Sequence, residues 1–165
     1  MATTFSTRIL EELKLEIPST QKCLERIEAK HFAFKPHPTS MEMGYLAVLV
    51  AQIPLWISYM IDVGEIDFKT FNQPEIKTND DLVSYFEANL KKAEKSLNEA
   101  TDEKLSGNFT LKNDGQELYS APKKQDIATA INHWIHHRGQ LTVYMRMNEI
   151  PVPSIYGPSA DDRNF

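Results

Sequence analysis

The chain has 165 residues, 41% of them hydrophobic, and its 18 Lys and Arg stand against 23 Asp and Glu, a formal net charge of −5 at pH 7. This length and composition suit one globular domain over residues 1–165 and exclude a disordered or fibrous chain. No basic stripe runs along any predicted helix, so the chain lacks the electrostatic signature of a nucleic-acid-binding protein. Its acidic balance also argues against attachment to an anionic membrane.

Three sequence features bear on where the protein resides. Residues 1–8 lack the apolar core of a secretory signal. The apolar run over residues 45–61 is interrupted by Gln52 and Pro54 and is short for a membrane span, so it predicts a buried helix. The single cysteine, Cys23, excludes an internal disulfide and lies on an apolar helical stripe, which predicts a buried thiol. We therefore expect a cytoplasmic protein without membrane attachment.

The first two predicted helices both contain proline. The first spans about residues 4–29, and Pro18 predicts a kink near residues 16–17. The pattern Thr39-x-x-Glu42 predicts a capping box at the start of the second helix, where the two side chains would bind free backbone N–H groups. The second helix is apolar over much of its surface, which predicts a central position. Its main apolar face holds Leu46, Leu49, Val50, Ile53, Ile57 and Met60.

The middle of the chain alternates between connections and regular elements. Residues 63–77 are polar and contain Gly and Pro, which predicts a long connection. Thr78-x-x-Asp81 then predicts a capped third helix with one buried, apolar side and charged outer faces. After it, the turn signature over residues 113–115, Asn-Asp-Gly, predicts a small hairpin near residues 109–119.

The fourth predicted helix, about residues 124–147, contains no proline. Arg138 falls within its apolar stripe, where a charge needs a buried carboxylate partner, and Gly139 predicts close backbone packing. The prolines beyond the helix predict an extended tail that packs over the helices. Four long amphipathic segments with few strands predict an all-α fold, a four-helix bundle. The apolar stripe of the fourth helix holds Ile127, Ile131, Trp134, Leu141 and Met145.

One sector of the fourth helix, beside its apolar stripe, gathers the residues suited to chemistry. His133 and His137 are one turn apart, so their imidazoles can share one transition-metal ion. Two ligands do not hold a metal tightly, and a further ligand from another helix is needed. Without one, the pair lines a groove or is hydrogen-bonded in the core. His136 points away from His133, so it either supports the other two histidines or lies at the surface. The sector comprises Asp126, Thr129, His133, His137, Gln140 and Tyr144.

Three stretches of the sequence are similar to the signatures of a known family. Residues 131–146, INHWIHHRGQLTVYMR, and residues 150–162, IPVPSIYGPSADD, resemble the C-terminal signature of the DinB/YfiT-like family. Residues 34–47, FKPHPTSMEMGYLA, resemble its second-helix signature. The order and spacing of these segments match the family over essentially the whole chain.

The resemblance implies a four-helix bundle with a long crossover connection, commonly assembled as a homodimer. It also implies a site in which three histidines bind a divalent metal, nickel or zinc. Two of them correspond to His133 and His137, and the third comes from the second helix in a pattern like Leu-Ala-x-His-x-Ala. This chain has Leu49 in that place, within Leu46-Ala-Val-Leu-Val-Ala. Leucine has no lone pair to donate, and losing one ligand removes several kcal/mol from a zinc-scale binding free energy of roughly 10–16 kcal/mol.

Two hypotheses of function follow. In the first, the protein is a non-catalytic bundle with a degenerate metal site, in which Leu49 packs against the imidazoles. Such a bundle would bind a small apolar or thiol-like ligand or act mainly as a dimeric interaction module. The alternative is a metal-dependent thiol transferase or hydrolase-like enzyme that uses His133 and His137 as ligands, with Gln140 and Tyr144 shaping the cleft. Substitute ligands have drawbacks, because His37 would need its loop to fold back and Gln52 suits such metals poorly.

Overall fold

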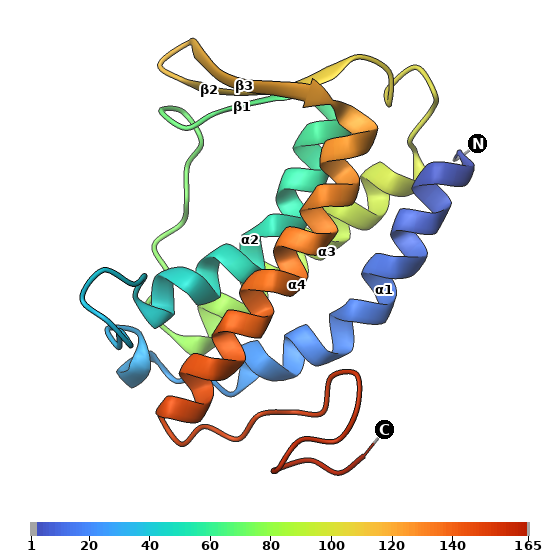
Figure 1. Ribbon diagram of the computed structural model, residues 1–165. Coiled ribbons are helices and arrows are strands. Elements are labelled where there is room, and N and C mark those ends of the chain that lie inside the picture. The colour runs from blue at the N-terminus through green and yellow to red at the C-terminus, as the bar shows by residue number, and fades with distance from the viewer. Residues whose placement is uncertain (1–2, 165) are drawn as a thin grey trace.

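A computed structural model describes residues 3–164, in which four long helices pack together and a small sheet lies across one end of them (Figure 1). The sheet means that the chain is not wholly helical, so the expected all-α class holds for the bundle alone. The helices are α1 (Thr4–Glu25), α2 (Met43–Asp62), α3 (Asn79–Asn98) and α4 (Lys123–Met147), with a short 3-10 turn at Ala29–His31. The strands are β1 (Glu65–Asp67), β2 (Asn108–Asn113) and β3 (Gln116–Pro122).

Helix α2 is the core helix of the bundle. It packs against both α3 and α4, and α1 packs against the same two neighbours. By length and composition α2 could cross a membrane, but most of its apolar surface is buried inside the protein. Pro18 and Pro54 lie inside α1 and α2, and both helices continue through the proline and bend, as Figure 1 shows. Cys23 faces this core, and burial raises the pKa of its thiol to about 11, as expected for a small buried thiol.

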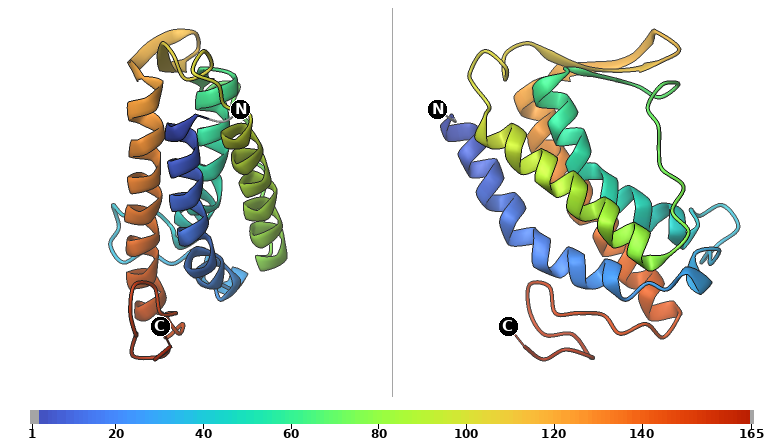
Figure 2. Two further views of the ribbon diagram at one scale, coloured as in Figure 1. Left: turned by 90° about the vertical axis from the view of Figure 1, so that its right-hand side faces the viewer. Right: turned by 180° about the vertical axis from the view of Figure 1, so that it is seen from behind.

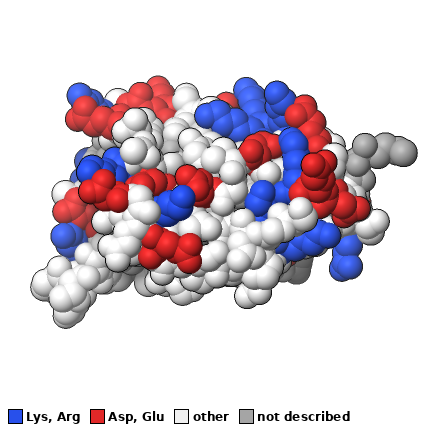
Figure 3. Space-filling view, turned by 90° about the horizontal axis from the view of Figure 1, so that it is seen from above, with Lys and Arg blue, Asp and Glu red and all other residues white. Residues whose placement is uncertain are grey.

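The connection between α2 and α3 is a crossover. Both helices run in the same direction, so residues 63–78 return along the length of the bundle (Figure 1). The two further views in Figure 2 show the C-terminal segment at the opposite end from the sheet. Seen from the side of the sheet, acidic and basic side chains are intermingled rather than segregated (Figure 3).

The hairpin agrees with the turn signature. Asp114 and Gly115 both have positive φ, 53° and 76°, as a two-residue turn between antiparallel strands requires. Their backbone N–H groups donate to the two carboxylate oxygens of Asp67, at 3.0 and 2.7 Å. These hydrogen bonds, first that from Gly115, hold the pKa of Asp67 below its usual range. Asp67 ends β1, which pairs in parallel with β2.

The two predicted capping boxes have different outcomes. Thr78 caps α3 as predicted, and Asp81 completes the box. The box predicted at Thr39 is wrong, because α2 begins at Met43. Its N-cap residue is Glu42, whose side chain makes no capping hydrogen bond. The first N–H groups of α2 instead donate to backbone carbonyls of the preceding loop, from Met43 to Phe34 and from Gly44 to Phe32, both at 2.9 Å. The loop therefore supplies what a side-chain cap would.

Arg138 is a buried charge on α4, with only 2% of its surface exposed. Its Nη1 lies 2.6 Å from Oε2 of Glu16 on α1, which is the buried carboxylate partner that the sequence requires. The same nitrogen donates to the hydroxyl groups of Ser19 and Thr20. Nη2 donates to the hydroxyl of Tyr156 at 2.9 Å, and that hydroxyl donates in turn to the Glu16 carboxylate at 3.0 Å. The cluster therefore joins α4, α1 and the tail.

The close packing predicted at Gly139 is wrong. The residue is exposed, and a Cβ placed on it would meet no described atom within 4 Å. Nothing in the structure explains glycine at this position.

We expect the substitution Glu16→Gln to lower the free energy of unfolding by about 3 kcal/mol, because it leaves a buried guanidinium without its counter-charge. Chemical denaturation measures this change. Glu12→Gln, at an exposed position on the same helix, is the matched control and should change the free energy of unfolding by less than about 0.5 kcal/mol. Equal effects of the two substitutions would contradict a stabilising role for the buried pair.

The two Thr-x-x-acid patterns give a second prediction. Thr78→Ala removes a real cap and should lower the free energy of unfolding by about 1 kcal/mol. Thr39→Ala should lower the free energy of unfolding by about 0.3 kcal/mol, since the Thr39 side chain is exposed and hydrogen-bonds to His37 in its own loop. A larger loss at Thr39 than at Thr78, in the same denaturation assay, would show that the assignment of the caps is incorrect.

Candidate functional site

The two histidines predicted as ligands lie together on α4. Nε2 of His133 is 2.7 Å from Nε2 of His137, and Nδ1 of His137 is 2.7 Å from Oε1 of Gln140. A carbonyl oxygen only accepts, so Nδ1 of His137 carries the proton and its Nε2 accepts from Nε2–H of His133. Nδ1 of His133 is then unprotonated. The side chains form a hydrogen-bonded relay from His133 through His137 to Gln140.

The relay is half-buried, and this affects the charge of both imidazoles. Burial is the main cause that lowers the pKa of His133 below 6.5, and the charge of His137 adds to it. Burial also lowers the pKa of His137, against the opposing effect of its hydrogen bond to Gln140. Both imidazoles are therefore neutral near pH 7.

Leu49 faces the same region from α2. With 9% of its surface exposed, it lines a cavity of about 340 Å³ between α2, the 63–78 connection and α4. We call this cavity the Leu49 pocket. Trp56, two helical turns further along α2, lines it as well, with its ring centroid 5.8 Å from that of His133. The lining residues are Tyr45, Leu49, Gln52, Trp56, Phe68, Phe71, Gln73 and His133.

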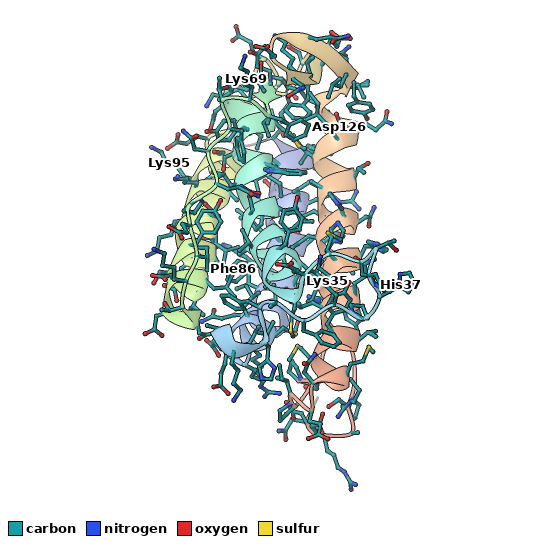
Figure 4. The ribbon with its side chains drawn as sticks, turned by 90° about the vertical axis from the view of Figure 1, so that its left-hand side faces the viewer. Lys35, His37, Lys69, Phe86, Lys95 and Asp126 are labelled. Carbon is teal, nitrogen blue, oxygen red and sulfur yellow. The ribbon has the colours of Figure 1, made fainter. Side chains whose placement is uncertain are left out.

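The substitute ligands considered from the sequence are not in place. Gln52 is buried, donates to the Tyr85 hydroxyl at 3.0 Å and accepts from Gln73 at 2.6 Å, so both ends of its amide are engaged. His37 lies in the exposed loop before α2, where Figure 4 labels it, and is hydrogen-bonded to Thr39 at 2.8 Å. It is not among the residues that line the pocket. His136 is exposed beside His137, as expected.

The residues present do not fit a three-histidine metal site. The two Nε2 atoms converge and could face one ion, but Leu49 and Trp56 beside them offer no lone pair. Among residues 3–164, no group of three or more His, Cys, Asp or Glu side chains is arranged to hold a metal. The chemistry that these residues themselves support is hydrogen bonding by neutral imidazoles beside an apolar cavity.

The remaining residues of the predicted sector have separate surroundings. Tyr144 is buried at the far end and packs edge-on against Phe34, with ring centroids 6.0 Å apart. Asp126 and Thr129 line a second cavity of about 250 Å³ beneath the hairpin, which we call the hairpin pocket. Trp56 and His133 line both pockets. Trp56 was not predicted from the sequence as a site residue, although its spacing from Leu49 places both on one face of α2.

The lowered pKa values predict how stability depends on pH. Below about pH 6.5 the unfolded histidines take up protons more readily than the folded ones. The contribution of the two neutral histidines to the free energy of unfolding is therefore complete above pH 6.5. It is lost as the pH falls through their lower folded-state pKa values. The combined substitutions His133→Asn and His137→Asn should weaken the fall in the free energy of unfolding between pH 7.5 and pH 5.

Denaturation at several pH values measures this difference. His37→Asn, in an exposed loop, is the control and should keep the wild-type pH dependence. An unchanged profile in the double variant would exclude the buried pair as its source.

Comparisons with known proteins extend the description of the fold. A dinb-like protein, YjoA, from Bacillus subtilis has a similar crystal structure, with a TM-score of 0.70, 23% identity and coverage of 94% of this chain and 99% of that one. A dinb-like protein from Bacillus cereus ATCC 10987 has a TM-score of 0.68 at 22% identity, covering 90% and 95%. At these identities the likeness establishes the fold.

Sequence comparison identifies the family. The uncharacterized protein YrdA of Bacillus subtilis strain 168 is 42% identical over 48 residues, which are 29% of this chain and 27% of that protein. This match therefore spans about a quarter of the length of YrdA. The family match is far longer, because it extends over residues 1–163. With the bundle and the crossover in place, the chain belongs to the DinB family.

Proposed function

We propose that this DinB family protein binds a small, uncharged organic ligand in the Leu49 pocket and does not carry a three-histidine metal centre. The observation that supports the proposal most directly is the apolar side chain of Leu49 opposite a histidine pair whose Nε2 atoms are hydrogen-bonded to each other. An aliphatic side chain in that place favours an organic occupant over an ion.

The lining of the Leu49 pocket indicates the chemistry of the ligand. Four aromatic side chains, those of Tyr45, Trp56, Phe68 and Phe71, contribute apolar surface. No Lys, Arg, Asp or Glu is among the residues that line it. A volume of about 340 Å³ is near the lower end for ligand pockets, which are mostly apolar with a few placed polar groups. A small apolar or thiol-like molecule satisfies these conditions.

The alternative function is a metal-dependent thiol transferase or hydrolase-like enzyme. One observation favours it: Gln140 fixes the tautomer of His137 with Nε2 directed toward Nε2 of His133, as a group supporting a metal ligand does. This alternative needs a third ligand from outside the described residues. In either case we propose a homodimer, as the family resemblance implies, and a cytoplasmic location, which the single cysteine favours.

The metal content of the untagged protein separates the two functions. We expect wild-type protein passed through gel filtration to hold nickel or zinc far below stoichiometry by elemental analysis. Leu49→His supplies the missing imidazole and should gain stoichiometric metal, and zinc should then raise its melting temperature. Leu49→Asn, polar and of similar size but without an imidazole, is the matched control and should gain neither.

Two results would overturn the proposal of a lost metal centre. Stoichiometric nickel or zinc in the wild-type protein would favour the enzyme. A Leu49→His variant that folds but binds no more metal than Leu49→Asn would mean that the pair is not the remainder of such a site. For the ligand itself, benzyl mercaptan should bind to the wild type in calorimetry, and Leu49→Trp, which fills the pocket, should abolish the binding.

A further inference from the structure

The hairpin pocket is a second cavity with different chemistry. It lies between α2, the hairpin and the first turns of α4, and its walls are mostly apolar. Figure 4 shows Asp126 at this end of α4, beneath the hairpin. Tyr119 of β3, 44% exposed, forms part of its rim, so the cavity meets solvent beside the hairpin. The lining residues are Trp56, Met60, Phe109, Leu111, Tyr119, Asp126, Thr129, Ala130 and His133.

Asp126 is the one acidic residue among those that line the hairpin pocket, and only 6% of its surface is exposed. Its Oδ1 accepts a hydrogen bond from the Tyr119 hydroxyl at 2.7 Å. Its Oδ2 is fully buried and has no hydrogen-bond partner within the described part of the chain. Buried polar atoms are nearly always paired, because leaving one unpaired costs about 1–3 kcal/mol. The second oxygen therefore indicates a donor that the protein itself does not supply.

The lysines nearest in sequence do not act as that donor. Nζ of Lys123 donates to the carbonyl oxygen of Lys104 at 3.0 Å, and Nζ of Lys124 is directed toward Asp102 at 3.5 Å. No Lys or Arg is among the residues that line the cavity. Nδ1 of His133, unprotonated in the relay, is a second acceptor on the lining. The lining also includes Trp56, whose Nε1–H donor is buried and has no partner within the described residues. The two acceptors, of which the carboxylate is the charged one, favour a ligand that donates hydrogen bonds.

We propose that the hairpin pocket binds a small organic amine, with its ammonium group at the carboxylate of Asp126 and its apolar body against Trp56, Met60 and Leu111. An ammonium ion supplies both the missing donor and the charge that a buried carboxylate needs. A cavity of about 250 Å³ admits a single ring with a short chain. This site goes beyond the proposed function, since it lies in another pocket and needs no metal.

Calorimetry with 2-phenylethylamine tests the proposal, with 2-phenylethanol as the neutral analogue of the same shape. The amine should bind the wild-type protein at least about tenfold more tightly than the alcohol, the effect of one charged hydrogen bond. Asp126→Asn keeps the shape of the side chain and removes its charge. It should weaken binding of the amine by about tenfold or more and leave the affinity for the alcohol nearly unchanged.

The matched control is Asp80→Asn. Asp80 lies in the first turn of α3 as Asp126 lies in the first turn of α4, but it is exposed, so the control removes the same helix-terminal charge without altering the pocket. It should keep wild-type affinity for the amine. Leu111→Trp fills the cavity from the hairpin and should abolish binding with Asp126 intact, which covers the case in which Asp126→Asn fails to fold.

Four results would overturn the proposal. Three are equal affinities for the amine and the alcohol, full amine affinity in a folded Asp126→Asn variant, and amine binding that survives Leu111→Trp. The fourth is failure of the amine to bind the wild type at all. None of these results bears on the metal analysis of Leu49→His, so the two proposals can fail separately.

Discussion

The buried ion pair between Arg138 and Glu16 sets the geometry on which the candidate site depends. A guanidinium deprived of water is tolerable only when its charge and its donors are satisfied, and here α1 and the tail supply all the partners. Arg138 must therefore face α1. Successive residues of a helix are 100° apart, so this requirement also fixes the rotation of α4 and directs His133 and His137 away from α1, toward the side that α2 covers. The packing of Arg138 against α1 thus determines where the two histidine side chains point.

Much of the bundle follows from local patterns in the sequence. Apolar periodicity identifies the four helices, Asn113-Asp114-Gly115 identifies the hairpin, and Thr78 identifies a cap, because each effect arises within a few residues. β1 could not be found in this way. It has three residues, and it is a strand only because it pairs with β2, more than forty positions away. The cap expected at Thr39 fails for a related reason, since carbonyl groups of the loop reach the first N–H groups of α2.

For the candidate site too, only the features that depend on residues close in sequence could be predicted. The spacing of His133 and His137 shows that they share a face, and the family resemblance singles out Leu49 as their counterpart on α2. The relay through Gln140 depends on rotamers, which spacing does not determine. The role of Asp126 depends on Tyr119, which reaches it from the hairpin. A contact between distant segments is visible only when the chain is folded.

The hydrogen bonds from the hairpin turn to Asp67 have a consequence for motion. This carboxylate holds the tip of the hairpin, and the residues that follow it, Phe68 and Phe71, form one wall of the Leu49 pocket. The hairpin itself roofs the other pocket. The Asp67 side chain therefore joins one wall of the Leu49 pocket to the hairpin that covers the other pocket. A displacement of the hairpin tip would therefore change the linings of both cavities.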